Sequence, residues 1–264
     1  MQHLALEPAS DTSPVPRADW LHRGDLATPT LAVVPGSRHA AWETFTRRQR
    51  QAWEWRRLRR HVAARPGLVV DLGCGFGDWA ARLTTIAARV VAVDVSPGFV
   101  AQTRQRLAAT GHRDWHVEHA DVRRFTDYHG ADLVVLGGVL TYLDDDDALE
   151  LLARVRDRLA PGGVVQQRDW CAVHLGRPSR EVVDGQFRAH RRPSAYVDLA
   201  RRAGLHVIEQ RSAAGQHAEQ LTYQTLGLRH DGLTAALAPL ARAVAGAGSL
   251  WARRGSVAFF LRRA

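Results

Sequence analysis

The sequence predicts an α/β protein built on a doubly wound, mostly parallel sheet of seven strands. Short apolar segments, typical of strands buried on both faces of a parallel sheet, alternate along the middle of the chain with segments of helical periodicity. A glycine-rich turn follows the first apolar segment and leads into a helix, an arrangement common at the ligand-binding edge of such sheets. Together these observations place helices on both faces of the sheet.

Each expected element follows from its local pattern. The predicted strands are Leu68–Leu72, Val90–Asp94, Trp115–His119, Ala131–Leu136, Val164–Asp169, Leu205–Arg211 and Ser256–Leu261. The predicted helices are 40–64, Gly77–Ala88, Pro97–Thr110, one that starts in Asp144–Asp147 and stops at Pro161-Gly162-Gly163, Ser194–Ala203 and Ala235–Ala245. Ser96 and Pro97 are favoured at a helix start, and carboxylates in a first turn meet the positive end of the helix dipole.

The strand–helix alternation also suggests how the chain is organised. Five prolines and little periodicity predict a loosely structured arm over residues 1–39. Residues 40–264 are expected to form a single domain whose regular core spans about 66–170. The alternation of strand and helix patterns stops at 171–192, which is predicted to be an irregular insertion on the substrate side. Residues 212–254 are predicted to be a second such insertion.

Charge is distributed unevenly along the 264 residues. The net charge is +9, and every basic residue among the 36 is arginine. Lysine and asparagine are absent, so GC-rich coding explains part of the arginine excess. Residues 1–65 carry +5, residues 66–170 carry −4 and residues 171–264 carry +8. The positive flanks are consistent with solvated helix faces, with an anionic substrate or with RNA.

The chain contains no feature of an exported or membrane protein. No apolar run approaches the ~20 residues that span a bilayer, and the N-terminal residues show no signal-peptide pattern. Cys74 and Cys171 are the only cysteines, too few for a disulfide scaffold. We therefore expect a soluble cytoplasmic protein that makes no membrane contact, while the sequence does not indicate an oligomeric state.

The glycine-rich turn has the spacing acidic-x-G-x-G-x-G, from Asp71 to Gly77, rather than the G-x-G-x-x-G of dinucleotide sites. Glycines permit positive φ and close approach of a ligand to the backbone. Asp94 ends the next strand, 23 residues after Asp71, where a carboxylate can accept both hydroxyls of a ribose. Enzymes that use NAD share this last feature, so it does not discriminate by itself.

With these residues in view, the stretch 66–170 resembles the class I S-adenosylmethionine-dependent methyltransferases. The resemblance implies S-adenosylmethionine as cofactor, no metal, and a last strand inserted antiparallel between the fifth and sixth. It implies that Asp94 binds the ribose, that Asp121 accepts the adenine amino group, and that the backbone after it meets the ring. The cofactor-binding residues so implied are Asp71, Gly73, Cys74, Gly75, Gly77, Asp94, Val95, Asp121, Val122 and Gly137.

Several sequence motifs that are missing from the chain narrow the range of possible methyl acceptors. The segment after the fourth strand, LGGVLTYL, lacks the Asn/Asp-Pro-Pro-Tyr element of enzymes that methylate DNA bases or glutamine amides. The missing lysines rule out the Lys-Asp-Lys-Glu tetrad of RNA ribose methyltransferases. What remains resembles the group that methylates N or O of small metabolites, including anionic ones and those of secondary metabolism. An RNA-modifying methyltransferase and a non-catalytic S-adenosylmethionine-binding protein stay open as alternatives.

Candidate catalytic residues follow the strands where ligands bind in such sheets. His190, which titrates near neutrality, could serve as a base, although an exposed or capping role is the commoner one. Asp169 could act on the substrate, pair with Arg168 or cap a loop, and Tyr142 follows the fourth strand. Arg191 and Arg192 could bind a carboxylate or phosphate or form a solvated pair.

Overall fold

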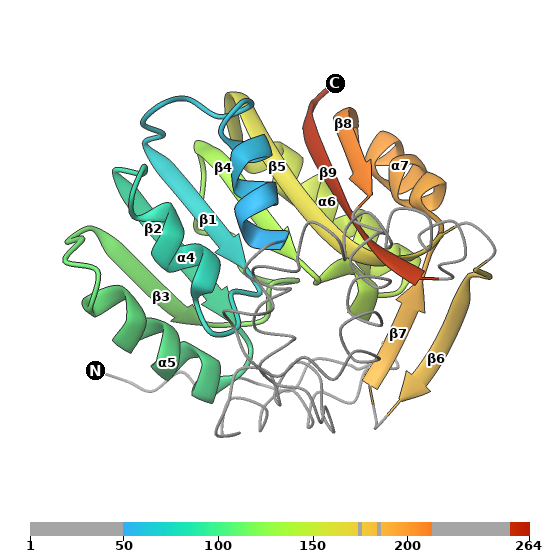
Figure 1. The fold of residues 1–264 in the computed structure, drawn as a ribbon, viewed down its shortest axis with the longest axis horizontal. Helices are drawn as coiled ribbons and strands as arrows, with labels where there is room; N and C mark the ends of the chain where they lie inside the picture. Colours follow the sequence, from blue (N-terminus) through green and yellow to red (C-terminus); the bar gives the residue numbers. More distant parts are fainter. Residues whose placement is uncertain (1–49, 174–175, 184–185, 213–253) are drawn as a thin grey trace, which may run out of the picture.

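The computed structural model describes residues 50–173, 176–183, 186–212 and 254–264. Seven strands form one sheet in the order β3-β2-β1-β4-β5-β9-β8, and two further strands form a separate hairpin (Figure 1). The sheet strands are β1 (Leu68–Leu72), β2 (Arg89–Asp94), β3 (Trp115–His119), β4 (Ala131–Gly137), β5 (Leu159–Ala172), β8 (Leu205–Ser212) and β9 (Arg254–Arg263). The predicted α/β fold with its mostly parallel sheet is confirmed.

The last strand, β9, lies between β5 and β8 and pairs antiparallel with both. The pairs β1–β2, β1–β4, β2–β3 and β4–β5 are all parallel. The topology implied by the family resemblance is therefore the observed one.

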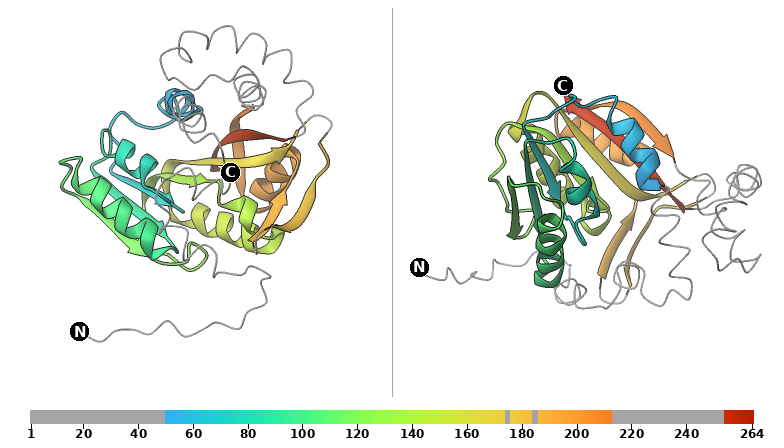
Figure 2. Two further views of the ribbon diagram at one scale, coloured as in Figure 1. Left: turned by 60° about the horizontal axis from the view of Figure 1, so that its bottom comes forward. Right: turned by 60° about the vertical axis from the view of Figure 1, so that its left-hand side comes forward.

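Helices cover both faces of the sheet because successive side chains of its buried strands point to opposite sides. In β4, Val134 and Leu136 pack in the cluster that holds α6 and α7, whereas Leu133 and Val135 pack in the cluster that holds α4 and α5. The helices are residues 50–58, α4 (Asp78–Leu83), α5 (Pro97–Ala108), the 3-10 turn η1 (Leu140–Tyr142), α6 (Asp145–Arg158) and α7 (Pro193–Arg202). Helix 50–58 and α6 lie on opposite sides of the sheet (Figure 2).

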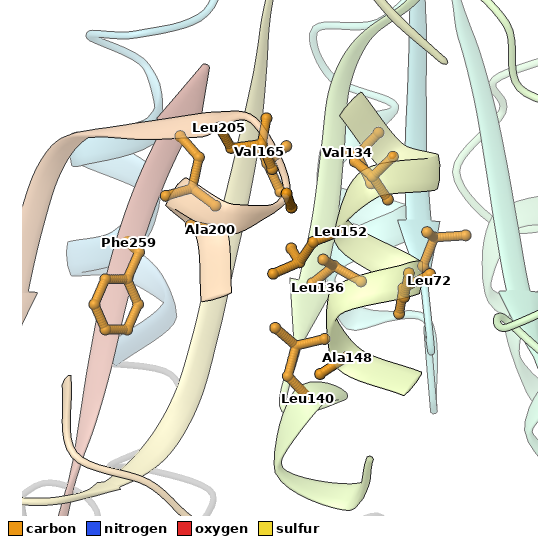
Figure 3. Close-up of a cluster of buried hydrophobic side chains, with 14 of the residues drawn as sticks. Leu72, Val134, Leu136, Leu140, Ala148, Leu152, Val165, Ala200, Leu205 and Phe259 are labelled. Carbon is orange, nitrogen blue, oxygen red and sulfur yellow. The ribbon is translucent and has the colours of Figure 1, made fainter. Parts of the chain in front are cut away.

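The larger core cluster lies between β1, β4 and α6. Leu72, Val134 and Leu136 from the strands face Ala148 and Leu152 of α6, and all five are fully buried (Figure 3). Ala200, Leu205 and Phe259 extend the cluster under α7. Burial of each large apolar side chain contributes about 1.5–3 kcal/mol, so this layer fixes the strands whose ends carry the site.

Two helices begin at the side-chain caps that the sequence predicts. The Oγ of Ser96 accepts a hydrogen bond from the N–H of Phe99 at 3.4 Å, at the start of α5. The Oδ1 of Asp144 accepts one from the N–H of Asp147 at 2.8 Å, at the start of α6.

The prediction of an irregular insertion over 171–192 was wrong. Strand β5 continues to Ala172 against β9, and β6 (Ser179–Val183) and β7 (Gln186–His190) form an antiparallel hairpin. The dipeptide Asp-Gly between the two hairpin segments is a hairpin signal in the sequence, but the apolar runs that flank it are too short to indicate strands by themselves.

Two predicted boundaries also differ. The helix expected to reach Ala88 ends at Leu83, because the hydroxyls of Thr84 and Thr85 bond the carbonyls of Ala81 and Arg82. Pro161-Gly162-Gly163 does not separate α6 from β5 but lies within β5, where the register with β4 shifts between Ala131 and Leu133.

The remaining expectations fall beyond what the structure describes. The N-terminal arm over 1–39, the first part of helix 40–64, helix Ala235–Ala245 and nearly all of the insertion 212–254 lie outside the described residues. Among the described helices, none is long and apolar enough to cross a membrane.

Candidate cofactor and acceptor site

A cavity opens at the carboxyl ends of the central strands, where parallel α/β sheets bind their ligands. Its wall includes the glycine loop after β1, the ends of β2 and β4, and the segment after β3. Residues of β5 and η1 close the other side.

The glycine loop is shaped by three residues with positive φ: Gly73 at 75°, Gly75 at 53° and Gly77 at 73°. A Cβ at Gly73 would lie 2.6 Å from Val139, and one at Gly77 would lie 2.7 Å from Thr103. A Cβ at Gly75 would meet no described atom within 4 Å, because this residue borders the cavity. Gly73 also lines the cavity, whereas Gly77 caps the start of α4.

Asp94, at the end of β2, is bonded to this loop. Its Oδ2 accepts a hydrogen bond from the N–H of Gly75 at 2.8 Å, and its Oδ1 accepts one from the N–H of Ser96 at 2.9 Å. Burial raises the pKa of the carboxyl group, and these backbone donors oppose that shift. Asp94 and Val95 both line the cavity.

Asp121 and Val122 line the cavity after β3. The Asp121 carboxylate accepts hydrogen bonds from the backbone N–H of Arg123 at 2.9 Å and from the Arg123 guanidinium at 2.8 Å. The same guanidinium donates to Asp147 at 2.9 Å, and these two carboxylates raise the pKa of Arg123. The arginine thus holds the segment after β3 against the start of α6.

Asp71 and Cys74 are placed beneath the loop rather than on the cavity wall. Burial raises the pKa of Asp71 to about 7, against a hydrogen bond from the N–H of Ala80. Its Oδ2 is buried and finds no hydrogen-bond partner in the described part of the chain. Burial likewise holds the pKa of the Cys74 thiol well above its ordinary range, with the Sγ 3.6 Å from the Oγ1 of Thr103.

The acceptor side of the cavity is formed by η1 and β5. Gly137 and Tyr142, which the sequence singles out, line it together with Trp170. Arg168 lines it too and was missed as a site residue. The signal that could have found it is the alternation of β5, which puts Arg168 on the same face as Trp170.

Asp169 points to the other face of β5 and is fully buried. Its Oδ1 accepts from the N–H of Thr141 at 2.9 Å, its Oδ2 accepts from the side-chain amide of Gln167 at 3.1 Å, and burial raises its pKa to about 7. Of the alternatives for Asp169, the pairing with Arg168 is not formed, because Arg168 forms its ion pair with Glu54 instead.

His190 lies in a second cavity, next to the hairpin and the start of α7, and does not line the first. Its Nδ1 lies 3.2 Å from the Oγ of Ser179 and 3.1 Å from the Oε1 of Glu181. Arg191 is buried rather than solvated. It bonds Asp145 and the carbonyls of Leu140 and Leu143, and so secures η1.

The sheet order, the antiparallel β9 and the glycine loop facing an acid at the end of β2 define the class I S-adenosylmethionine-dependent methyltransferase domain. Residues 69–163 match the family model described as "Methyltransferase domain". Residues 69–163 are therefore similar to a methyltransferase domain, and the cofactor that this similarity supports is S-adenosylmethionine.

Three similar proteins illustrate the range of the class. Nodulation protein S of Sinorhizobium fredii is 36% identical over 95 residues, which is 36% of this chain and 43% of that protein. Trans-aconitate 2-methyltransferase of Methylobacterium nodulans is 35% identical over 130 residues, which is 48% of this chain and 46% of that protein. The solved structure of the cyclopropane synthase MmaA2 from Mycobacterium tuberculosis superposes with a TM-score of 0.67 at 16% identity, over 96% of this chain and 99% of that one.

The match to nodulation protein S and trans-aconitate 2-methyltransferase spans less than half the length of each. The solved structure, at its low identity, shows the fold.

The residues present fit S-adenosylmethionine. The open side of Gly75 leaves room for a ligand against the backbone, and Asp94 places a carboxylate at the same point. Among the described residues, no group of three or more His, Cys, Asp or Glu side chains could hold a metal ion.

Proposed function

We propose that this protein transfers the methyl group of S-adenosylmethionine to a nitrogen or oxygen atom of a small, anionic metabolite. The observation that carries the proposal is a single cavity. One wall of it is the glycine loop with Asp94, and the other wall is formed by Tyr142, Arg168 and Trp170. Cofactor and acceptor can therefore meet in one cavity.

We assign the binding of the cofactor to residues of the first wall. Asp94 would hold the ribose, Asp121 and Val122 the adenine, and Gly73, Gly75 and Gly137 would let the ligand approach the backbone. Asp71 and Cys74 would act indirectly, by supporting the loop from below. When bound, the cofactor supplies a methyl group on a sulfonium, an electrophile whose departing thioether is neutral.

Because that leaving group is neutral, the protein needs no acid to assist it. The task of the chain is to hold the acceptor atom in line with the methyl group at about 3 Å, and such positioning can contribute several kcal/mol. The flat ring of Trp170 and the short turn of η1, which is fixed by Arg191, are suited to this task.

A base is required only if the acceptor arrives protonated. Of the three residues predicted from the sequence, Tyr142 lines the cavity, so we propose that its hydroxyl contacts the acceptor. Asp169 is buried behind η1, where it bonds the N–H of Thr141, and we propose that it positions η1. His190 would act on an acceptor only if that acceptor extended toward the hairpin.

Two observations support a small acceptor. The cavity at the sheet ends and η1 has a volume of only about 230 Å³. In addition, a similar protein is named for a small carboxylate, trans-aconitate. The arginine-rich flanks keep an RNA acceptor as the alternative, and S-adenosylmethionine binding without turnover as a second one.

The proposal is tested with methyl-labelled S-adenosylmethionine, offered with a metabolite extract in one reaction and host RNA in another. Label in a small acidic product supports it. Label in RNA, with activity that falls steeply as salt rises, identifies the RNA alternative. Cofactor binding in calorimetry with no labelled product identifies the non-catalytic alternative.

A further inference from the structure

We propose that Arg168 is the carboxylate-binding residue of the cavity, and that it recognises a carboxylate carried by the ligands of the methyl-transfer reaction. The inference rests on the proposed function and adds to it the group that recognises negative charge.

The charged side chains on the described wall are Asp94, Asp121, Arg123 and Arg168. Arg123 is committed, because its guanidinium bonds both Asp121 and Asp147. Arg168 is therefore the positive group on this wall that is available to a ligand.

Arg168 is only partly neutralised by protein. Its Nε lies 3.7 Å from the Oε1 of Glu54, and Glu54 also pairs with Arg50 at 3.8 Å. No acceptor in the described part of the chain lies within hydrogen-bonding distance of its guanidinium. A guanidinium presents five N–H donors and stays charged. The donors of Arg168 that reach the cavity can therefore bind a ligand.

The guanidinium lies beside the end of β4, where two glycines leave space for it. A Cβ at Gly137 would lie 3.4 Å from the Nη2 of Arg168, and one at Gly138 would lie 3.7 Å from it. The N–H of Gly138 also donates to the carbonyl of Arg168 at 2.6 Å. The two strand ends are thus tied together, so the side chain leaves β5 from a fixed point beside the cavity.

The charge balance favours a carboxylate over a phosphate. A carboxylate matches the planar fork of one guanidinium with two parallel hydrogen bonds and a single negative charge. A phosphate would bring up to two negative charges, whereas the one positive charge of Arg168 is already partly balanced by Glu54. The carboxylates of Asp94 and Asp121 on the same wall would repel the second charge.

The carboxylate can come from two sources. One is the amino-acid end of the cofactor, and the other is the methyl acceptor. Both would meet the same guanidinium with the same chemistry, and the experiment separates them.

Calorimetry of the full chain compares wild type, Arg168→Gln and Arg168→Lys with two ligands, S-adenosylhomocysteine and 5′-methylthioadenosine, which lacks the amino-acid end. If the cofactor supplies the carboxylate, Arg168→Gln weakens S-adenosylhomocysteine about tenfold or more and leaves 5′-methylthioadenosine unchanged. Arg168→Lys keeps the positive charge but loses the planar fork of the guanidinium. Its affinity for S-adenosylhomocysteine is therefore expected to lie between those of wild type and Arg168→Gln.

If the acceptor supplies the carboxylate, Arg168→Gln binds both nucleosides as wild type does. In that case the label transferred to the acidic product fraction falls about tenfold or more at limiting acceptor. Arg89→Gln, at an exposed arginine outside the cavity, is the matched control and should match wild type throughout.

Two results would overturn the proposal. One is an equal loss of both nucleosides together with a lowered melting temperature in both Arg168 variants, since that pattern is structural. The other is unchanged binding with unchanged labelling. A wild-type protein that binds neither nucleoside refutes the proposed function itself, which separates that failure from failure of the Arg168 assignment.

Discussion

The carboxylate of Asp94 accepts a hydrogen bond from the backbone N–H of Gly75 at 2.8 Å, so the end of β2 is fastened to the middle of the glycine loop. Both residues line the same cavity. Two positions that are far apart in the sequence are thus presented to one ligand, and the bond sets the distance between them before a ligand arrives.

The first prediction concerns Asp94. Replacing it by asparagine removes the negative charge and one acceptor oxygen while preserving the shape. We expect S-adenosylhomocysteine to bind about tenfold or more weakly, because charge-assisted bonds to the ribose hydroxyls are lost. Isothermal calorimetry measures this, and Asp114→Asn, at an exposed residue, is the control. Equal affinities of wild type and Asp94→Asn for S-adenosylhomocysteine would show that Asp94 does not bind the cofactor.

The second prediction separates backbone strain from ligand contact at Gly75. Gly75 and Gly111 both have positive φ, and a Cβ at either would meet no described atom within 4 Å. Alanine at either residue should therefore cost about 1–2 kcal/mol of stability. Only Gly75→Ala should also lose cofactor affinity, because only Gly75 borders the cavity. Urea unfolding combined with calorimetry checks both parts, and retained affinity in Gly75→Ala would contradict the second.

The third prediction concerns pH. Burial raises the pKa of Asp169 to about 7, whereas an unfolded aspartate titrates near its ordinary 3.8. Between these values the native state holds a proton that the unfolded state has released, so the contribution of Asp169 to stability is present below pH ~4 and is lost as pH rises to ~7. Asp169→Asn should therefore gain stability relative to wild type over this range, by roughly 1.4 kcal/mol for each unit between the two pKa values at most.

The variant should fold, because an amide oxygen can still accept from the N–H of Thr141. The Oε1 of Gln167 also finds no partner among the described residues and could accept from the new amide after a flip of the glutamine. Urea unfolding of both proteins at a series of pH values measures the difference. Parallel pH profiles would show that Asp169 is ionised in the native state over the whole range.

The fourth prediction concerns His190. The ring contacts Ser179 and Glu181 in the second cavity, so His190→Ala should leave the affinity for S-adenosylhomocysteine within about twofold of wild type. If His190 serves as a base, the rate of methyl transfer falls much more than the affinity does. Single-turnover labelling provides the rate, and Glu181→Gln tests whether the neighbouring carboxylate matters. Unchanged turnover in His190→Ala would make the residue structural.

Much of the fold could be predicted because local chemistry and tertiary structure agree over residues 66–170. The run from Ala131 to Leu136 is apolar because both faces of β4 are covered, and Ser96 and Asp144 cap the helices that the pattern places after them. The spacing from Asp71 to Asp94 predicted that the acid at the end of β2 would face the glycine loop.

The acceptor side was harder to predict because its residues are brought together by long-range contacts. Asp169 and Arg168 are neighbours in sequence but lie on opposite faces of β5, and the partner of Arg168 is Glu54, on the helix over 50–58. No local pattern reveals that pairing. The hairpin β6–β7 carries His190 away from the cavity into a second one, a placement that depends on how the hairpin packs against η1 and α7.

The bulge at Pro161-Gly162-Gly163 lies upstream of all the β5 residues that concern ligands. Inserting or deleting one residue there, with the β5–β9 ladder shifting to match, would turn Asp169 toward the ligand and bury Arg168, which would exchange a cationic selector for an anionic one. A change in strand phase alone could thus invert the charge that β5 presents to the cavity, without substituting any residue that lines it.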